Sequence, residues 1–377
     1  MQVTQIATIL NTITEEITGE TGIVQEDLTG VVDLGNTVFS SDWKDNYVKS
    51  MIDRIGKTVF VDRPYSGFAP SILRTDWEYG SILAKIRAKD FEAKENPSWS
   101  LTAGQTVDQF EYNPPEVKQG FWNQRQSWQI DCSFAEEQVK SAFTSAQEMN
   151  AFFAMIESTI DNSRTQKMDA LAMRCINRLI TTADGNQISS LKTDYNSVYG
   201  SNPTSILAPD FLRFTAYRIL DFKDMLKVRS TLFNQGGAGY NRHTPPEDLH
   251  VVINSVIGRA IDVFLQSDTY HNDFTDIGRY ETVPFWQAPN VIPSGETDPV
   301  INVEARMAID IKDGESEISV SNIMGVLFDR DAVAMNNTNM RVTSSYNANG
   351  EYYNNFYKVD TNCMVDKSEN AIVLQYE

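Results

Sequence analysis

The chain has 377 residues, of which 41% are hydrophobic and 22% are charged. It is long enough for two or three domains and apolar enough to bury a core. Its 32 basic and 51 acidic residues give a formal net charge of −19, and an acidic chain repels phosphate, which disfavours a dedicated DNA- or RNA-binding role.

The N-terminal part is predicted to hold two helices joined by an extended segment. Apolar residues at spacings of three or four predict a short amphipathic helix over 4–17. Glycines interrupt the pattern over 18–36, which predicts an extended arm. Asp42 is expected to cap a second helix, which Gly56 ends.

Residues 58–128 are predicted to form a long β-hairpin that projects from the body. The sequences at 58–61 and 127–130 are typical of strands, and the segment between them is rich in turn-forming and aromatic residues. A segment of this length is too long for a plain loop inside a compact domain. From Asp62 to Arg125 it carries nine acidic and eight basic residues. Mixed signs suit contacts between copies of one chain, although an ordinary solvated surface is equally compatible.

Aromatic side chains on a projecting element favour a protein–protein interface, and a small independent core is the alternative. The residues expected at an interface between subunits are Trp77, Tyr79, Lys85, Arg87, Lys89, Trp99, Phe110, Tyr112, Phe121 and Trp122.

The strongest helical pattern covers 141–180, where apolar residues follow the helical spacing and neither proline nor glycine intervenes. At roughly 1.5 Å per residue, such a helix would cross a whole domain. We expect Ile156, Ile160, Leu171 and Ile176 to lie on its buried face.

Strands alternate with helices after Gly185, which predicts an α/β part and, for the whole chain, the α+β class. Asp210 is expected to cap a helix over 210–229. The other elements expected are a helix at 256–265 and strands at 249–253, 283–286, 305–311, 323–328, 352–359 and 371–374.

Few residues offer chemistry. His250 lies in an apolar strand, where a hydrogen-bonded, partly buried side chain is the better interpretation than a catalytic base. The sequence GGAGY at 236–240 lacks the phosphate-binding glycine patterns and is interpreted as a mobile loop. Three cysteines, far apart and without CxxC spacing, argue against a disulfide framework and a zinc site and favour a reducing compartment. We therefore predict no catalytic, cofactor or metal site and no enzyme. No signal peptide or membrane span is evident.

Four pieces of the sequence carry a resemblance to a known family. The chain resembles the major capsid proteins of short-tailed phages related to the small Bacillus phage phi-twenty-nine. The order of its elements is similar to the capsid fold named after phage Hong Kong 97. The four pieces are VKSMIDRIGKTVF at 48–60, KQGFWNQRQSW at 118–128, RHTPPEDLHVVIN at 242–254 and NNFYKVDTNCMVDKSENAIVL at 354–374.

This resemblance implies a division of the chain and a set of partners. Hexamers and pentamers would form an icosahedral or prolate shell around double-stranded DNA, which the shell meets only by non-specific proximity. A scaffolding protein and a portal would be partners, membranes would not, and the shell would assemble in the host bacterial cytoplasm and end in the virion. The implied parts are an N-terminal arm (1–36), a peripheral domain with the spine helix (37–57, 129–183 and 321–377), the extended loop (58–128) and an axial domain (184–320).

Two other functions stay open from the sequence. One is an encapsulin-like compartment with the same fold, which would need a cargo-loading pocket. The other is an acidic carbohydrate-active enzyme, in which Asp76 and Glu78 would face each other across a cleft beside Trp77, Trp99 and Trp122.

Overall fold

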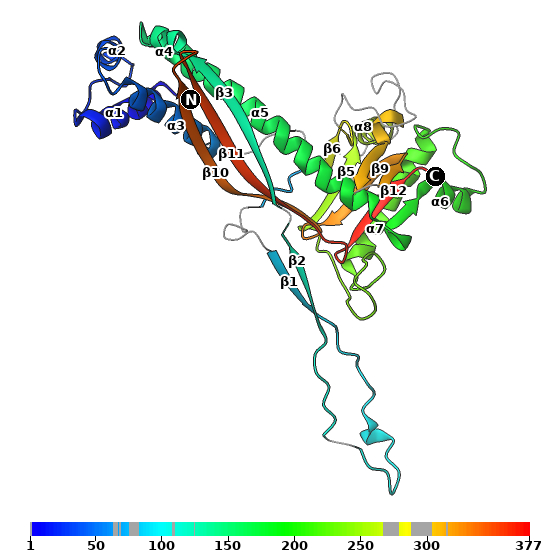
Figure 1. The fold of residues 1–377 in the computed structure, drawn as a ribbon. Helices are drawn as coiled ribbons and strands as arrows, with labels where there is room; N and C mark the ends of the chain where they lie inside the picture. The colour runs from blue at the N-terminus through cyan, green and yellow to red at the C-terminus, as the bar shows by residue number, and fades with distance from the viewer. Residues whose placement is uncertain are drawn as a thin grey trace.

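A computed structural model of the chain describes residues 2–62, 67, 69–74, 83–107, 110–123, 125–266, 279–287, 304–313 and 316–377. The molecule is elongated. A helical N-terminal part and a sheet-based part lie at the two ends of one long helix, and a thin hairpin projects away from both (Figure 1). Among the described residues, no helix combines the length and the apolar character that a bilayer crossing requires.

The N-terminal part contains one helix more than the sequence predicted. Val31, Leu34 and Val38 are buried on a helix that begins inside the segment expected to be extended. Its apolar face packs into the core, and this packing outweighs the glycines around it. The three helices are α1 (Val3–Thr18), α2 (Val31–Phe39) and α3 (Lys44–Asp62).

Gly56 does not end α3, and the backbone stays helical through 58–61, where a strand was predicted. The reason lies across the core. A Cβ atom at position 56 would stand 1.9 Å from Cε1 of the buried Tyr357. The glycine therefore makes room for the tyrosine ring and is not a helix terminator here.

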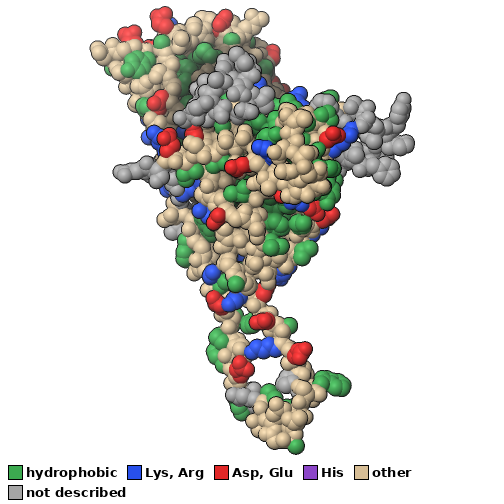
Figure 2. Space-filling model, turned by 90° about the vertical axis from the view of Figure 1, so that its right-hand side faces the viewer, with side chains coloured by type: hydrophobic (Ala, Val, Ile, Leu, Met, Phe, Trp, Pro, Cys, Tyr) green, Lys and Arg blue, Asp and Glu red, His purple; other side chains and the backbone are tan. Residues whose placement is uncertain are grey.

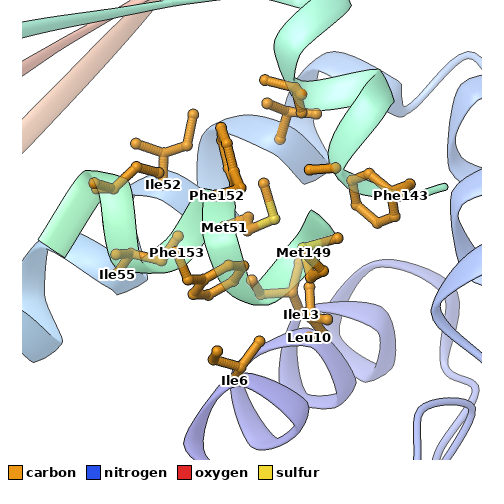
Figure 3. Close-up of a cluster of buried hydrophobic side chains, with 14 of the residues drawn as sticks. Ile6, Leu10, Ile13, Met51, Ile52, Ile55, Phe143, Met149, Phe152 and Phe153 are labelled. Carbon is orange, nitrogen blue, oxygen red and sulfur yellow. The ribbon is translucent and has the colours of Figure 1, made fainter. Parts of the chain in front are cut away.

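The first hydrophobic cluster joins α1 and α3 to the start of the long helix α5 (Ala146–Thr181), which follows the short helix α4 (Glu136–Ala142). Side chains from the three helices point into a common interior (Figure 3). They include Ile6, Leu10, Ile13, Met51, Ile52, Ile55, Met149, Phe152 and Phe153.

Helix α5 is one uninterrupted helix of 36 residues. Ser145 caps its start, because the side chain accepts a hydrogen bond from the Glu148 backbone N–H at 3.2 Å. Ile156 and Ile160 are buried in the first cluster, whereas Leu171 and Ile176 are buried in a second one. The four predicted residues thus lie inside the protein, but in two different cores that the helix connects.

Three long antiparallel strands contact α5, in the order β10–β11–β3. Strand β3 (Arg125–Ala135) pairs with β11 (Tyr352–Val365), so residues 125–128 belong to the body and not to the projecting hairpin. Strand β10 (Val333–Asn347) was not predicted, because its run of Asn, Thr and Ser lacks the usual apolar alternation.

A five-stranded sheet forms the other end, in the order β4–β12–β9–β5–β6. Strands β9 and β12 come from beyond residue 320 but share this sheet with β5 and β6. The strands are β4 (Ile188–Ser190), β5 (Leu249–Asn254), β6 (Glu281–Val283), β9 (Ile323–Asp329) and β12 (Ala371–Gln375); a separate pair is β7 (Ile309–Asp313) and β8 (Ser316–Val320).

Helices α6 (Leu191–Tyr199), α7 (Pro209–Lys227) and α8 (Ser255–Gln266) accompany the five-stranded sheet. Ala208, and not Asp210, is the N-cap of α7. Pro209 is the first residue of α7, and proline is suited to this position because it has no N–H to leave unpaired.

Candidate functional site: the projecting hairpin and its base

The projecting element is an antiparallel pair of strands, β1 (Leu83–Ala88) and β2 (Val117–Trp122). Leu83 pairs with Trp122 near the body, and Ala88 pairs with Val117 farther out. Beyond them the chain runs to a distant tip and returns (Figure 1). The hairpin predicted over 58–128 is therefore shorter at both ends. Trp77 and Tyr79 lie outside the described residues.

The outer part of the hairpin carries exposed aromatic rings. Trp99 is 96% exposed, Phe110 84% and Tyr112 83%. Phe91 is also exposed, as is Phe121 nearer the body, and hydrophobic side chains are visible along the projecting arm (Figure 2). A small independent core therefore does not form around these rings. Large apolar groups in water favour association, because covering them releases hydrating water.

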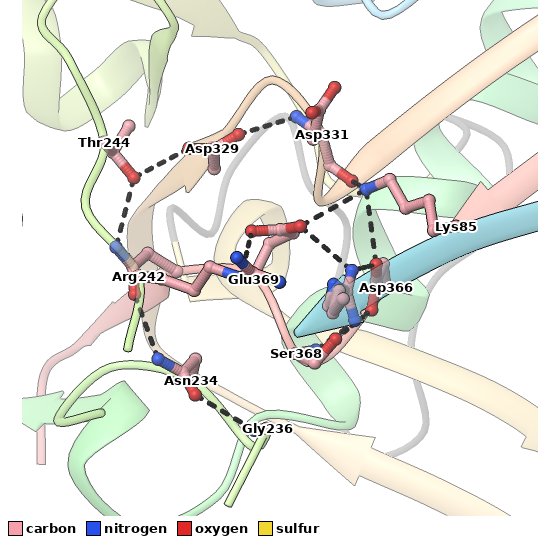
Figure 4. A network of polar contacts seen from close by, with 12 residues as sticks. Lys85, Asn234, Gly236, Arg242, Thr244, Asp329, Asp331, Asp366, Ser368 and Glu369 are labelled. Carbon is pink, nitrogen blue, oxygen red and sulfur yellow. Dashed lines mark hydrogen bonds and ion pairs between the residues drawn. The ribbon is translucent and has the colours of Figure 1, made fainter. Parts of the chain in front are cut away.

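The inner part is held by ion pairs within the same chain. Lys85 Nζ lies 3.3 Å from Asp366 Oδ2 and 3.4 Å from Glu369 Oε1. Arg87 pairs with Asp366 and donates to Glu369 Oε1 at 2.9 Å, while Arg242 Nε lies 3.4 Å from Glu369 Oε2. These side chains, which we call the base cluster, converge between β1 and the turn before β12 (Figure 4). Lys85 and Arg87 thus have partners inside their own chain.

The base cluster is partly buried, and its charges compensate one another. Burial alone would raise the pKa of Asp366, but hydrogen bonds from Ser368 and the charges of Lys85 and Arg87 lower that pKa below its usual range. Asp366 is 4% exposed and Lys85 17%. Breaking an ion pair shielded to this degree from one side is costly, because the remaining charge stays buried without its partner.

Trp122 anchors β2 in the same region. Its Nε1 donates a hydrogen bond to the Val365 carbonyl oxygen at 3.1 Å. Leu83 and Trp122 also pack against Ala334 and Met364. Trp122 therefore belongs to the attachment of the hairpin, in contrast to the exposed rings farther out.

The glycine-rich sequence at 236–240 is a contact surface for the hairpin. The Gly239 carbonyl accepts a hydrogen bond from the Asp90 backbone N–H at 2.9 Å. Lys118 Nζ donates to the Gly236 carbonyl at 3.0 Å and lies 4.2 Å from the centre of the Tyr240 ring. Gly239 has a φ of 83°, and a Cβ there would stand 2.6 Å from Cε of Lys89. The glycines that predicted a mobile loop therefore allow the hairpin to approach closely.

Lys89 lies just outside the base and pairs with Glu116 across the hairpin at 2.9 Å. The hydrogen bond and charge of Glu116 raise the pKa of Lys89, and Lys89 lowers the pKa of Glu116 in the same way. Asp366 and Glu369 were not predicted as partners, since nothing in their local sequence relates them to a hairpin far away in the chain.

His250 lies in a pocket of about 520 Å³ beside Glu247, Arg279 and Glu281. Its Nδ1 is 3.8 Å from Glu281 Oε1, and its ring stacks on Phe328 at 5.4 Å. The neighbouring His250 side chain lowers the pKa of Glu281, and burial opposes this shift. Glu281 also accepts from the Ser71 backbone N–H at 3.1 Å, so it joins two segments of the fold. Across the described ranges, no three metal-ligating side chains come together.

The fold of this chain is similar to the folds of chains in solved phage structures. The capsid structure of Staphylococcus phage Andhra is 11% identical to the chain, covering 84% of this chain and 86% of that chain with a TM-score of 0.53. A chain in the structure of the head fiber and inner core protein gp22 of native bacteriophage P68 is 10% identical, with coverages of 84% and 87% and a TM-score of 0.50. No curated protein sequence matches the chain.

The family model for the Phi29-like phage major capsid protein matches residues 6–375, nearly the whole sequence. This match confirms the resemblance drawn from the sequence, whereas neither the encapsulin-like compartment nor the carbohydrate-active enzyme finds support. The chain belongs to the Phi29-like phage major capsid proteins and forms the shell of a phage head.

Proposed function

We propose that copies of this chain assemble as hexamers and pentamers into an icosahedral or prolate shell around double-stranded DNA, with the hairpin of each copy lying over a neighbouring copy. The exposed rings of Trp99, Phe110 and Tyr112 carry this proposal. They stand on an arm whose base is fixed to its own body, so the tip is presented at a defined place. A neighbouring subunit would remove these rings from water.

The proposed interface is the outer hairpin and not the whole hairpin. Trp99, Phe110 and Tyr112 stay in it, and Lys89 lies at its inner limit. Phe121 is exposed but pairs with Ala84 on the body side of Lys89, so it lies outside this interface. Lys85, Arg87 and Trp122 act in attachment. The proposed division of the chain changes in one respect: β9 and β12 count with the axial domain, because they lie in its sheet.

The remaining parts of the proposal follow from the family. A scaffolding protein would guide assembly in the host cytoplasm, a portal would occupy one vertex, and the finished shell would be part of the virion. The net charge of −19 supports non-specific proximity to DNA and not dedicated binding. The shell would build these contacts without catalysing a reaction, through many weak interfaces that add up over repeated copies.

Removing residues 92–114 and joining the ends with a short turn tests the proposed overlap. Lys89, Asp90, Glu116 and Lys118 remain in this variant, so the contacts with the 236–240 loop are preserved. We expect a folded body with unchanged circular dichroism and no closed shells by electron microscopy. Hydrogen exchange at the wild-type tip should be fast in the monomer and slow in shells.

A triple variant tests the aromatic rings themselves, and a double variant on the same arm provides the matched control. Trp99→Ser with Phe110→Ser and Tyr112→Ser should also prevent closed shells, because it removes the apolar groups and keeps the arm. Lys94→Gln with Glu111→Gln removes an exposed ion pair on the same arm, whose atoms lie 3.7 Å apart, and should still assemble. Closed shells from the shortened chain would show that the tip is not needed at the interface.

A further inference from the structure

Two cysteines that are far apart in the sequence meet beside the hairpin base. Cys175 lies on α5 and is 4% exposed, and Cys363 lies on β11 and is half-buried. Both pack in the second hydrophobic cluster and both line one pocket of about 230 Å³. Both are free thiols.

The pocket is positively charged around these sulfur atoms. Arg174, Arg178 and Lys367 line it together with Cys175 and Cys363. The neighbouring Cys175 thiol lowers the pKa of Cys363, burial opposes this, and the charge of Arg174 adds to the lowering. The neighbouring Cys363 thiol, followed by burial, raises the pKa of Cys175. The basic lining would stabilise a thiolate at Cys363, and the thiolate is the nucleophilic form of cysteine.

We propose that Cys175 and Cys363 form an oxidisable dithiol site, which a small anionic disulfide such as oxidised glutathione converts into a disulfide between α5 and β11. The carboxylates of glutathione match the positive lining of the pocket. Cys363 is the first to react because it is the more accessible of the two.

The chemistry is two successive thiol–disulfide exchanges. In the first, the Cys363 thiolate attacks one sulfur of oxidised glutathione, and one glutathione thiolate leaves and takes up the proton that Cys363 released. In the second, Cys175 loses its proton and attacks the Cys363 sulfur, and the second glutathione leaves as a thiol. Two protein thiols are oxidised, and one glutathione disulfide is reduced to two thiols.

The location gives this bond a consequence. Val365, whose carbonyl accepts the Trp122 hydrogen bond, lies two residues beyond Cys363 on the same strand. A bond from Cys363 to Cys175 would fix this strand to the long helix. The timing of this disulfide rests on the proposed function: the bond would form after the shell leaves the reducing cytoplasm of its host.

Peptide mapping of the purified chain tests the site. Wild-type chain is treated with oxidised glutathione, its remaining thiols are alkylated, and the digest is analysed by mass spectrometry. We expect two of the three thiols to disappear, with Cys175 and Cys363 in one linked peptide and the mass lower by two hydrogens. Cys132 is the internal control, since burial raises its pKa, and it should remain alkylated.

Two variants separate the steps. Cys175→Ser should stop at a stable glutathione adduct on Cys363, whereas Cys132→Ser should behave like the wild type. The proposal is overturned if all three thiols survive, if Cys132 reacts as fast as Cys363, or if disulfides form only between chains. Because the measurement uses the isolated chain, its outcome does not depend on shell assembly.

Discussion

Replacing Asp366 with asparagine removes one negative charge from the base cluster while keeping the size of the side chain. The Asp366 carboxylate meets Lys85 and Arg87 on one side and accepts from the Ser368 hydroxyl at 2.7 Å on the other. The amide can still accept from Ser368. Its NH₂ group, however, would face the two cations, where a donor meets donors.

The size of the loss follows from the geometry. At 3.3 Å and an effective dielectric constant of about 20, the attraction between Lys85 and Asp366 is about 5 kcal/mol before desolvation is counted. Removing one partner of a buried pair costs about 3–5 kcal/mol. Glu369 stays within 3.4 Å of Lys85 and compensates part of the charge. We therefore expect Asp366→Asn to lower the free energy of unfolding by about 2–3 kcal/mol.

The contribution of Asp366 depends on pH with a definite sign. Its folded-state pKa is lowered from 3.8, although burial acts in the opposite direction. A carboxylate with a lowered folded pKa stabilises the fold above its unfolded pKa, and this stabilisation is lost as the pH falls through the folded value. The wild type should lose stability below about pH 4, and Asp366→Asn should lose less over the same interval.

Urea unfolding of the monomeric chain at pH 7, together with hydrogen exchange in β1, measures both effects. Exchange in β1 should quicken in Asp366→Asn, because the hairpin can open locally. Asp210→Asn is the control, since the Asp210 side chain is 79% exposed and pairs only with Arg213 at 3.6 Å among the contacts resolved for it. A loss below about 0.5 kcal/mol, no greater than that of the control, would refute the argument.

Two further substitutions test the core. Ile160→Asp buries an unpaired charge in the first cluster and should lower the free energy of unfolding by roughly 3 kcal/mol or more, measured by thermal or urea unfolding. The control is Ser158→Asp at a neighbouring exposed position, which should change stability little. Equal stability of the two variants would contradict the burial of Ile160. Gly56→Ala should lower the free energy of unfolding by about 2 kcal/mol, because the new methyl group would overlap the Tyr357 ring. This loss is expected despite the better helix propensity of alanine, and a gain in stability would show that the contact is not tight.

Elements with a strong local pattern could be predicted from the sequence. The apolar spacing over α5 gave its extent closely, and the runs at β5, β9 and β12 were placed within a residue or two. Local pattern failed where a distant contact decides the outcome. Gly56 would end many helices, but Tyr357 supplies a reason for a glycine within this one. The polar strand β10 is fixed by its pairing with β11 and not by its own alternation.

The hairpin was predictable as an exposed element, and its attachment was not. Aromatic, proline and glycine content marked it, and the exposed Trp99 and Phe110 lie where that reasoning puts them. Lys85 carries no local sign that it would meet Asp366, because the two residues are 281 positions apart in the sequence. Equally, the wide separation of Cys175 and Cys363 in the sequence hid the contact between them.

The long helix and the long strands have a mechanical consequence. At about 1.5 Å per residue, the 36 residues of α5 span about 54 Å, and the 15 residues of β10 span about 50 Å. Their contacts make a two-layer beam. Bending these two layers lengthwise would strain the hydrogen bonds of α5, which run along the helix axis, and the already extended backbone of the strands. The helix and the strands are therefore expected to move as one rigid unit that connects the two hydrophobic clusters, and changes of shape should occur in the segments outside it.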